Sequence, residues 1–143
     1  MQVSSLITGK LVQTIAPGAT IQELSKSLAE LKIGALIVSS DGKNILGIVS
    51  ERDIVQALPL HMHEIEKIHV RDIMTVNVMT CKKDSTIAQL MALMTDKRIR
   101  HVPVVDDSGA LISIISIGDV VKSYVSEMDS ERSALLDYVK SAG

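Results

Sequence analysis

Two short segments place a serine and an aspartate three residues apart, each time at the end of an apolar run. They are GIVSERD, residues 47–53, and SIISIGD, residues 113–119. A serine at this position can cap a helix, and an acid in the first turn interacts favourably with the helix dipole. The same atoms could bind a nucleotide, because N–H groups at a helix start attract a phosphate and a carboxylate can accept from both hydroxyls of a ribose. Ser50, Asp53, Ser116 and Asp119 are therefore candidates for both roles.

The two segments belong to an internal repeat. Residues 7–58 align with residues 73–124 without a gap, with more identities than ordinary composition gives by chance. Two equivalent crevices are therefore expected, one for each Ser-x-x-Asp segment. The identical pairs include Thr14/Thr80, Thr20/Thr86, Ile21/Ile87, Leu24/Leu90, Ile33/Ile99, Asp41/Asp107, Ser50/Ser116 and Asp53/Asp119.

Each repeat has the pattern strand, helix, strand, strand, helix. Thr20 with Glu23, and Thr86 with Gln89, have the capping-box spacing that starts a helix. The apolar runs on either side of SSDGKN and of DDSG predict two hairpins. One repeat is too small to bury both faces of its sheet. We therefore expect an α/β (α+β) fold, in which two β-α-β-β-α repeats pack around a pseudo-twofold axis with a C-terminal helix beyond them.

The repeat pattern divides the chain into four segments. Residues 1–58 form the first repeat with its N-terminal segment, residues 59–69 a linker, residues 70–125 the second repeat and residues 126–143 a helical tail. Apolar residues in the tail fall close to a heptad spacing that Arg132 interrupts. The tail could pair with a second copy or lie on its own domain.

Basic residues precede the central strand of the second repeat. Arg98, Arg100 and His101 suit an anion, although they could also form a solvated charged segment. The first repeat has Lys32, Gly34 and Ala35 at the matching positions, so its crevice should be roomier and less basic. We expect two sites that differ, with the more basic one preferring a ligand with an accessible phosphate.

Composition excludes several other classes of partner. The formal net charge is −2, and the only aromatic residues are Tyr124 and Tyr138, which argues against nucleic-acid binding. The lone Cys81 cannot form an internal disulfide, the N-terminal segment does not resemble a signal peptide, and no apolar run is long enough to cross a bilayer. These features predict a cytoplasmic protein with no membrane insertion.

No set of residues suggests catalysis. Cys81 has no evident base, and His61, His63 and His69 fall in the linker, where a solvated run is more plausible than a metal site. We therefore expect no enzyme activity, no catalytic cofactor and no metal.

The segments GIVSERDIV and RIRHVPVVDDSGALISIISIGDVVK resemble the two signature segments of a tandem cystathionine-β-synthase (CBS) domain pair, or Bateman module. The resemblance covers about residues 5–125 and is greatest to short stand-alone bacterial proteins of this type. It implies a regulatory module that binds an adenosine-based ligand, with AMP favoured and ATP, NAD or S-adenosylmethionine as other members of the class. It also implies a homodimer, or a regulated enzyme or transporter as partner.

The resemblance also assigns roles to residues. Asp53 and Asp119 would hold ribose, Ser50 and Ser116 would assist them, and Arg100 and His101 would contact phosphate. The segments Thr14–Thr20 and Thr80–Thr86 would frame the base. The full expected set is Thr14, Thr20, Ile48, Val49, Ser50, Asp53, Thr80, Asp84, Thr86, Arg100, His101, Ile114, Ile115, Ser116, Gly118 and Asp119.

One position departs from the family pattern. The glycine before the apolar pair is Gly47 in the first repeat but Ser113 in the second. If a base must approach there, the second site fits less well. The alternative function is a ligand-independent dimeric scaffold, in which both Ser-x-x-Asp segments only cap helices.

Overall fold

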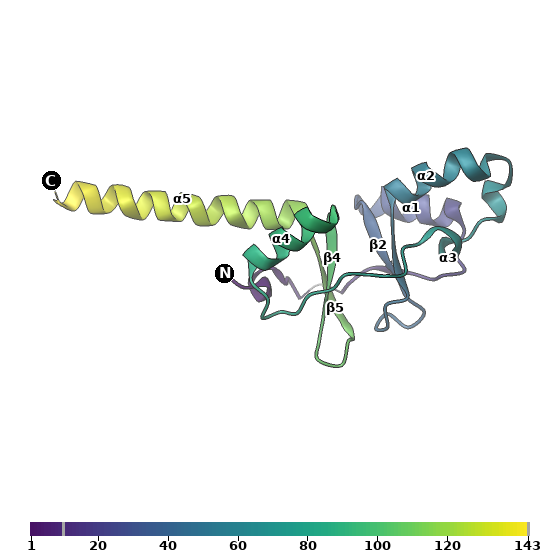
Figure 1. Cartoon of the computed structure of the whole chain (residues 1–143), viewed down its shortest axis with the longest axis horizontal. Helices are drawn as coiled ribbons and strands as arrows, with labels where there is room; N and C mark the ends of the chain where they lie inside the picture. The colour runs from purple at the N-terminus through teal and green to yellow at the C-terminus, as the bar shows by residue number, and fades with distance from the viewer. Residues whose placement is uncertain (10, 143) are drawn as a thin grey trace.

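The computed structural model describes residues 1–9 and 11–142. The chain forms two halves of mixed helix and strand, and a long C-terminal helix projects away from the second half (Figure 1). The two-repeat α/β fold expected from the sequence is confirmed. In the described residues, no helix combines the length and the apolar character that a membrane span requires.

The first half contains the complete repeat pattern. Its strands are β1 (Thr14–Ile15), β2 (Ala35–Val38) and β3 (Gly47–Ser50), and its helices are α1 (Ile21–Leu31) and α2 (Glu51–His61). β1 pairs parallel with β2, and β2 pairs antiparallel with β3. The apolar stripe of α1, which includes Leu24 and Leu28, packs on Leu36 and Val49 of the sheet. The first hairpin and the helix that Thr20 caps are therefore confirmed.

The second half repeats the pattern with one reduced element. It contains α4 (Ile87–Lys97), β4 (His101–Val105), β5 (Leu111–Ser116) and α5 (Ile117–Ala142), with β4 and β5 antiparallel. The expected first strand is a single parallel bridge between Cys81 and Val104. The second core contains Leu90, Met94 and Ile115, among others.

The segment that precedes each repeat packs on the opposite half. The 3-10 helix η1 (Val3–Leu6) places Val3 in the core of the second half, and the Val3 N–H donates to the Ser85 carbonyl at 2.8 Å. The short helix α3 (Val70–Ile73) places Val70 in the core of the first half, and the Val70 N–H donates to the Ala19 carbonyl at 2.9 Å. This exchange joins the two halves, so the boundaries at residues 58 and 70 separate repeats in the sequence but not in space.

The linker and the tail are both more regular than the sequence indicated. Residues 59–61 form the last turn of α2, which continues through Pro59, and Met62–Lys67 form the 3-10 helix η2. The tail continues the last helix of the second repeat, so that α5 is one uninterrupted helix of 26 residues.

Candidate functional site

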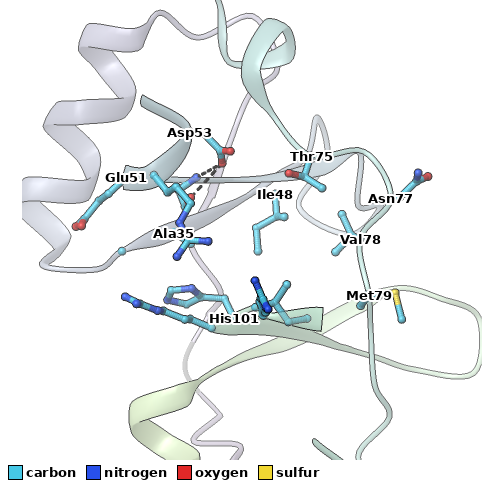
Figure 2. Close-up of a pocket in the computed structure, with 15 residues that line it drawn as sticks. Ala35, Ile48, Glu51, Asp53, Thr75, Asn77, Val78, Met79 and His101 are labelled. Carbon is cyan, nitrogen blue, oxygen red and sulfur yellow. Dashed lines mark hydrogen bonds between the residues drawn. The ribbon is translucent and has the colours of Figure 1, made fainter. Parts of the chain in front are cut away.

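A cleft of about 280 Å³ lies between the two halves. Figure 2 shows Asp53 and His101 on opposite sides of the cleft, with Ile48 between them. Three parts of the chain form its walls: the β3–α2 junction with the start of β2, the loop from α4 to β4, and the segment after α3. The lining residues are Gly34, Ala35, Ile48, Ser50, Glu51, Arg52, Asp53, Thr75, Asn77, Val78, Met79, Arg98, Ile99, Arg100 and His101.

The first wall contains the first Ser-x-x-Asp segment, which caps a helix. β3 ends at Ser50 and α2 begins at Glu51. Oδ2 of Asp53 accepts from the Ser50 N–H at 2.8 Å and from the Ser50 hydroxyl at 3.1 Å. Oδ1 of Asp53 accepts no hydrogen bond from the described residues. Because a carboxylate offers about four acceptor positions, capping leaves Asp53 able to accept from a ligand.

The second Ser-x-x-Asp segment forms a similar cap at the start of α5, in which the serine hydroxyl accepts rather than donates. The Ser116 N–H donates to Asp119 Oδ2 at 3.0 Å, and the Asp119 N–H donates to the Ser116 hydroxyl at 3.2 Å. The capping interpretation is therefore confirmed for both segments. It does not exclude ligand binding, since the cap uses only one oxygen of each carboxylate.

The second wall is the basic loop between α4 and β4. Arg98, Arg100 and His101 face the same cleft as Gly34 and Ala35. The expectation that these two sets belong to different crevices is therefore wrong. The physical reason is the packing of the repeats: β2 and β4 begin beside one another, and a Cβ atom on Gly34 would lie 3.4 Å from His101 Cε1.

The pKa of the His101 imidazole is lowered from its ordinary value. Burial lowers the pKa of its imidazole, and the positive charge of Arg100 lowers it further. Asp119 and Glu51 oppose this shift through their negative charges. The imidazole is therefore neutral near pH 7 and can gain a proton when an anion binds beside it.

The third wall is a segment that sequence reasoning missed. Thr75, Asn77, Val78 and Met79 follow α3 and line the cleft. A backbone bridge holds this segment to β3: the Ile48 N–H donates to the Thr75 carbonyl at 3.0 Å, and the Thr75 N–H donates to the Ile48 carbonyl at 2.9 Å. Among the equivalent residues 9–13, only Val12 matches its counterpart, Val78, so the repeat gave little indication of this wall.

Gly47 provides the space for this segment. A Cβ atom on Gly47 would lie 2.7 Å from Met74 Sδ and 2.8 Å from the Thr75 carbonyl oxygen. Gly47 itself is not among the lining residues. The position is therefore small so that the segment after α3 can approach, and the approach of a base to it stays a prediction.

Several residues of the expected site lie elsewhere. Val49 and Ile115 lie in the two cores, with 0% and 1% of their surfaces exposed, and neither lines the cleft. Thr20 and Thr86 cap the starts of α1 and α4, about 16 Å of helix away from the loops that reach the cleft. Thr14 pairs with Ile37 within the sheet, and Thr80 and Asp84 are exposed outside the cleft.

A second crevice around Asp119 stays a prediction. Ser116 pairs with His101 across β4 and β5, which places the start of α5 near the basic loop. Ile114, Gly118 and Asp119 lie on the same part of the second half. Leu11, in the segment equivalent to residues 75–79, has 90% of its surface exposed.

The cleft combines three kinds of chemistry. It has a carboxylate with free acceptor capacity, three basic side chains opposite it and an apolar patch of Ile48, Val78 and Met79. Within the described part of the chain, no three His, Cys, Asp or Glu side chains group as metal ligands. Burial raises the pKa of the Cys81 thiol to about 11, which makes it a poor nucleophile. The arrangement suits binding of a polar, anionic and partly flat molecule.

Comparison with known proteins gives relatives over most of the chain. The CBS domain family model matches residues 3–60 and 70–126. The CBS domain-containing protein CBSX3, mitochondrial, of Arabidopsis thaliana is 35% identical over 125 residues, which are 85% of this chain and 60% of the relative. This chain therefore spans about 60% of the length of that relative.

Solved structures of similar proteins share the fold. The CBS-domain containing protein ATU1752 from Agrobacterium tumefaciens is 41% identical with a TM-score of 0.81, covering 87% of this chain and 99% of that one. The CBS domain pair of protein MJ0100, solved in complex with 5′-methylthioadenosine and S-adenosyl-L-methionine, is 25% identical with a TM-score of 0.76, covering 87% and 99%. On the family match to both repeats and this agreement in fold, the chain belongs to the CBS domain family.

Proposed function

We propose that the chain is a regulatory module that binds an adenine nucleotide, AMP in particular, in the cleft between its two repeats. Ligand occupancy would act through a dimer of the chain or through a partner protein such as a regulated enzyme or transporter. The proposal includes no catalytic step, because the cleft offers a binding surface and no evident nucleophile or acid–base pair.

One observation carries the proposal: Asp53 and the basic loop occupy opposite walls of one cleft. A ribose diol can donate two hydrogen bonds to the free acceptor positions of Asp53. A 5′-phosphate would then lie toward Arg98, Arg100 and His101, which can form charge-assisted hydrogen bonds with it. The base would pack on Ile48, Val78 and Met79. The ribose, the phosphate and the base of a nucleotide would therefore each contact side chains of suitable chemistry.

The choice of a phosphorylated ligand rests on the charge of the cleft. The related domain pair of MJ0100 was solved with two adenosine compounds that carry sulfur at the 5′ position. The basic side chains that line this cleft, Arg52, Arg98, Arg100 and His101, favour a ligand with an anion at that position. We favour AMP over ATP and NAD, because Glu51 also lines the cleft and would repel additional negative charge.

Calorimetric titration of the purified chain tests this assignment. We expect AMP to bind more tightly than adenosine, ATP, NAD or S-adenosylmethionine. Binding of AMP and adenosine with equal affinity would contradict a phosphate role for the basic loop. Absence of heat and of any thermal stabilisation with all five ligands would contradict nucleotide binding.

A second candidate is a ligand-independent dimeric scaffold. It is favoured by the capping hydrogen bonds, which give Asp53 and Asp119 a structural role in the absence of any ligand. In that case Asp53→Ala would lower the melting temperature, and no adenosine compound would raise the melting temperature of either the natural chain or the variant.

A further inference from the structure

The distal part of α5 has no partner within the chain. Every residue from 128 to 142 is exposed, and Figure 1 shows this part of the helix projecting beyond the second half. The exposed side chains include Met128 at 52%, Leu135 at 63% and Val139 at 58%. An isolated helix of about 15 residues is only marginally stable in water. The projecting half of α5 therefore gains little stabilisation from packing within the described part of the chain.

Six apolar residues of α5, together with Arg132, form a heptad stripe. Val121, Val125, Met128, Arg132, Leu135, Val139 and Ala142 follow one another at alternating intervals of four and three residues. This spacing is the seam of a two-stranded coiled coil. The stripe is continuous along α5 apart from Arg132.

The body of the protein packs on a different face of α5. Val120 is buried in the second core, the Ser123 hydroxyl lies 2.9 Å from Met1 Sδ, and Glu127 is half-buried. At 100° per residue, this face is roughly a third of a turn from the stripe. The contacts that hold α5 to the domain therefore leave the whole stripe open.

Charge determines which occupant and which orientation fit the stripe. Asp129 and Glu131 flank the stripe on its two sides, and Arg132 forms no ion pair with the described residues. A parallel second copy would place Arg132 opposite Arg132 of that copy. An antiparallel copy centred near Ser130 instead places Arg132 opposite Met128 of that copy, beside its Asp129 and Glu131. The same register pairs Val121 with Val139 and Val125 with Leu135.

We propose that the α5 stripe binds α5 of a second copy of the chain as an antiparallel two-helix coiled coil. Arg132 fixes the orientation, because only the antiparallel arrangement separates the two guanidinium groups and surrounds them with four acids. The overlap from Val121 to Val139 is about 28 Å long. This interface is separate from the nucleotide cleft, so the inference does not depend on the proposed ligand.

Light scattering and sedimentation of the full chain at micromolar concentration test the interface. We expect the mass of two chains for the natural protein. Leu135→Asp should raise the dissociation constant of the dimer at least about tenfold, because it would bury a carboxylate among apolar side chains. Ser133→Asp, on the same turn but outside the stripe, is the matched control and should stay dimeric. A monomeric natural chain, or a Leu135→Asp variant that remains fully dimeric, would overturn the proposal.

Single cysteines test the orientation. In a Cys81→Ala background, Val121→Cys and Val139→Cys are each made separately, and the two proteins are oxidised alone and as a mixture. The antiparallel register predicts a disulfide-linked species in the mixture only. Cross-linking of either variant with itself would show a parallel pair and contradict the role given to Arg132.

Discussion

The imidazole of His101 packs against Gly34 at the junction of the two repeats, where a Cβ atom on Gly34 would lie only 3.4 Å from His101 Cε1. Gly34 precedes β2 and His101 begins β4, so this contact holds the starts of two equivalent strands together. It brings the basic loop of the second repeat to the Ser-x-x-Asp segment of the first. A site made by both repeats follows from this contact.

His101 should make the stability of the ligand-free protein depend on pH. Its folded-state pKa is lowered by burial and by Arg100. Well above about pH 6.5, the imidazole is neutral in both the folded and unfolded states. As the pH falls below that value, the unfolded chain binds the proton first, so the free energy of unfolding decreases until folded His101 is itself protonated.

Urea denaturation at a series of pH values from 7.5 to about 5 measures this effect. His101→Gln should reduce the decrease, whereas His63→Gln, which changes an exposed residue outside the cleft, should not. An unchanged pH dependence in His101→Gln would show that His101 is not the responsible group.

Asp53→Ala should weaken AMP binding more than it destabilises the fold. The variant loses the ribose acceptor, and hydrogen bonds to charged groups are worth roughly 1.5–3 kcal/mol, while loss of a helix cap costs about 0.5–2 kcal/mol. Asp72→Ala is the matched control, because Asp72 accepts from the His69 N–H in the same capping geometry at 2.9 Å but lies outside the cleft.

Calorimetry and thermal melting of the two variants separate the roles. We expect both to melt at lower temperature and only Asp53→Ala to lose affinity. Asp119→Ala should weaken binding at a second crevice without unfolding the protein. Natural affinity in Asp53→Ala, combined with a lower melting temperature, would leave capping as the only role of the segment.

Arg100→Ala should weaken AMP and leave adenosine unchanged. The expected loss for AMP is about one to two orders of magnitude, because one charged donor is removed. The affinity of the natural protein for AMP should also fall with added salt, as screening weakens the charge interaction. Arg71→Ala, outside the cleft, serves as the control. An equal loss for adenosine and AMP would exclude a phosphate contact.

Gly47→Ala should open the third wall of the cleft. The added methyl group would collide with Met74 and with the Thr75 carbonyl, which must move away from β3 at a cost of about 1–3 kcal/mol. We expect a lower melting temperature together with weaker AMP binding. Ser113→Ala, at the equivalent position of the second repeat, should change neither the melting temperature nor the affinity for AMP. Natural binding in Gly47→Ala would show that the segment after α3 does not contribute to the site.

Local patterns predicted the elements of this fold well. The capping boxes, the two hairpins and the repeat itself are encoded over short distances, and Thr86 and Gln89 form the expected reciprocal cap. The same local patterns identified Ser50, Asp53, Arg100 and His101, all of which line the cleft.

Contacts between distant parts of the chain determined the features of the site that local sequence patterns did not predict. Alternation along β3 and β5 places Val49 and Ile115 in the cores, although each is adjacent to an expected ligand contact. The exchange of η1 and α3 between the halves brings residues 75–79 to β3, and no pattern within either repeat encodes that contact. The grouping of Gly34 with His101 depends likewise on how the repeats dock.

A crystal structure of the chain grown with AMP tests the central claim most directly. The account predicts a nucleotide in the cleft between the repeats, with its ribose hydroxyls on Asp53, its phosphate beside Arg100 and His101, and its base against Ile48 and Val78. An empty cleft at saturating AMP would contradict this account, and so would a nucleotide bound with its phosphate toward Asp53.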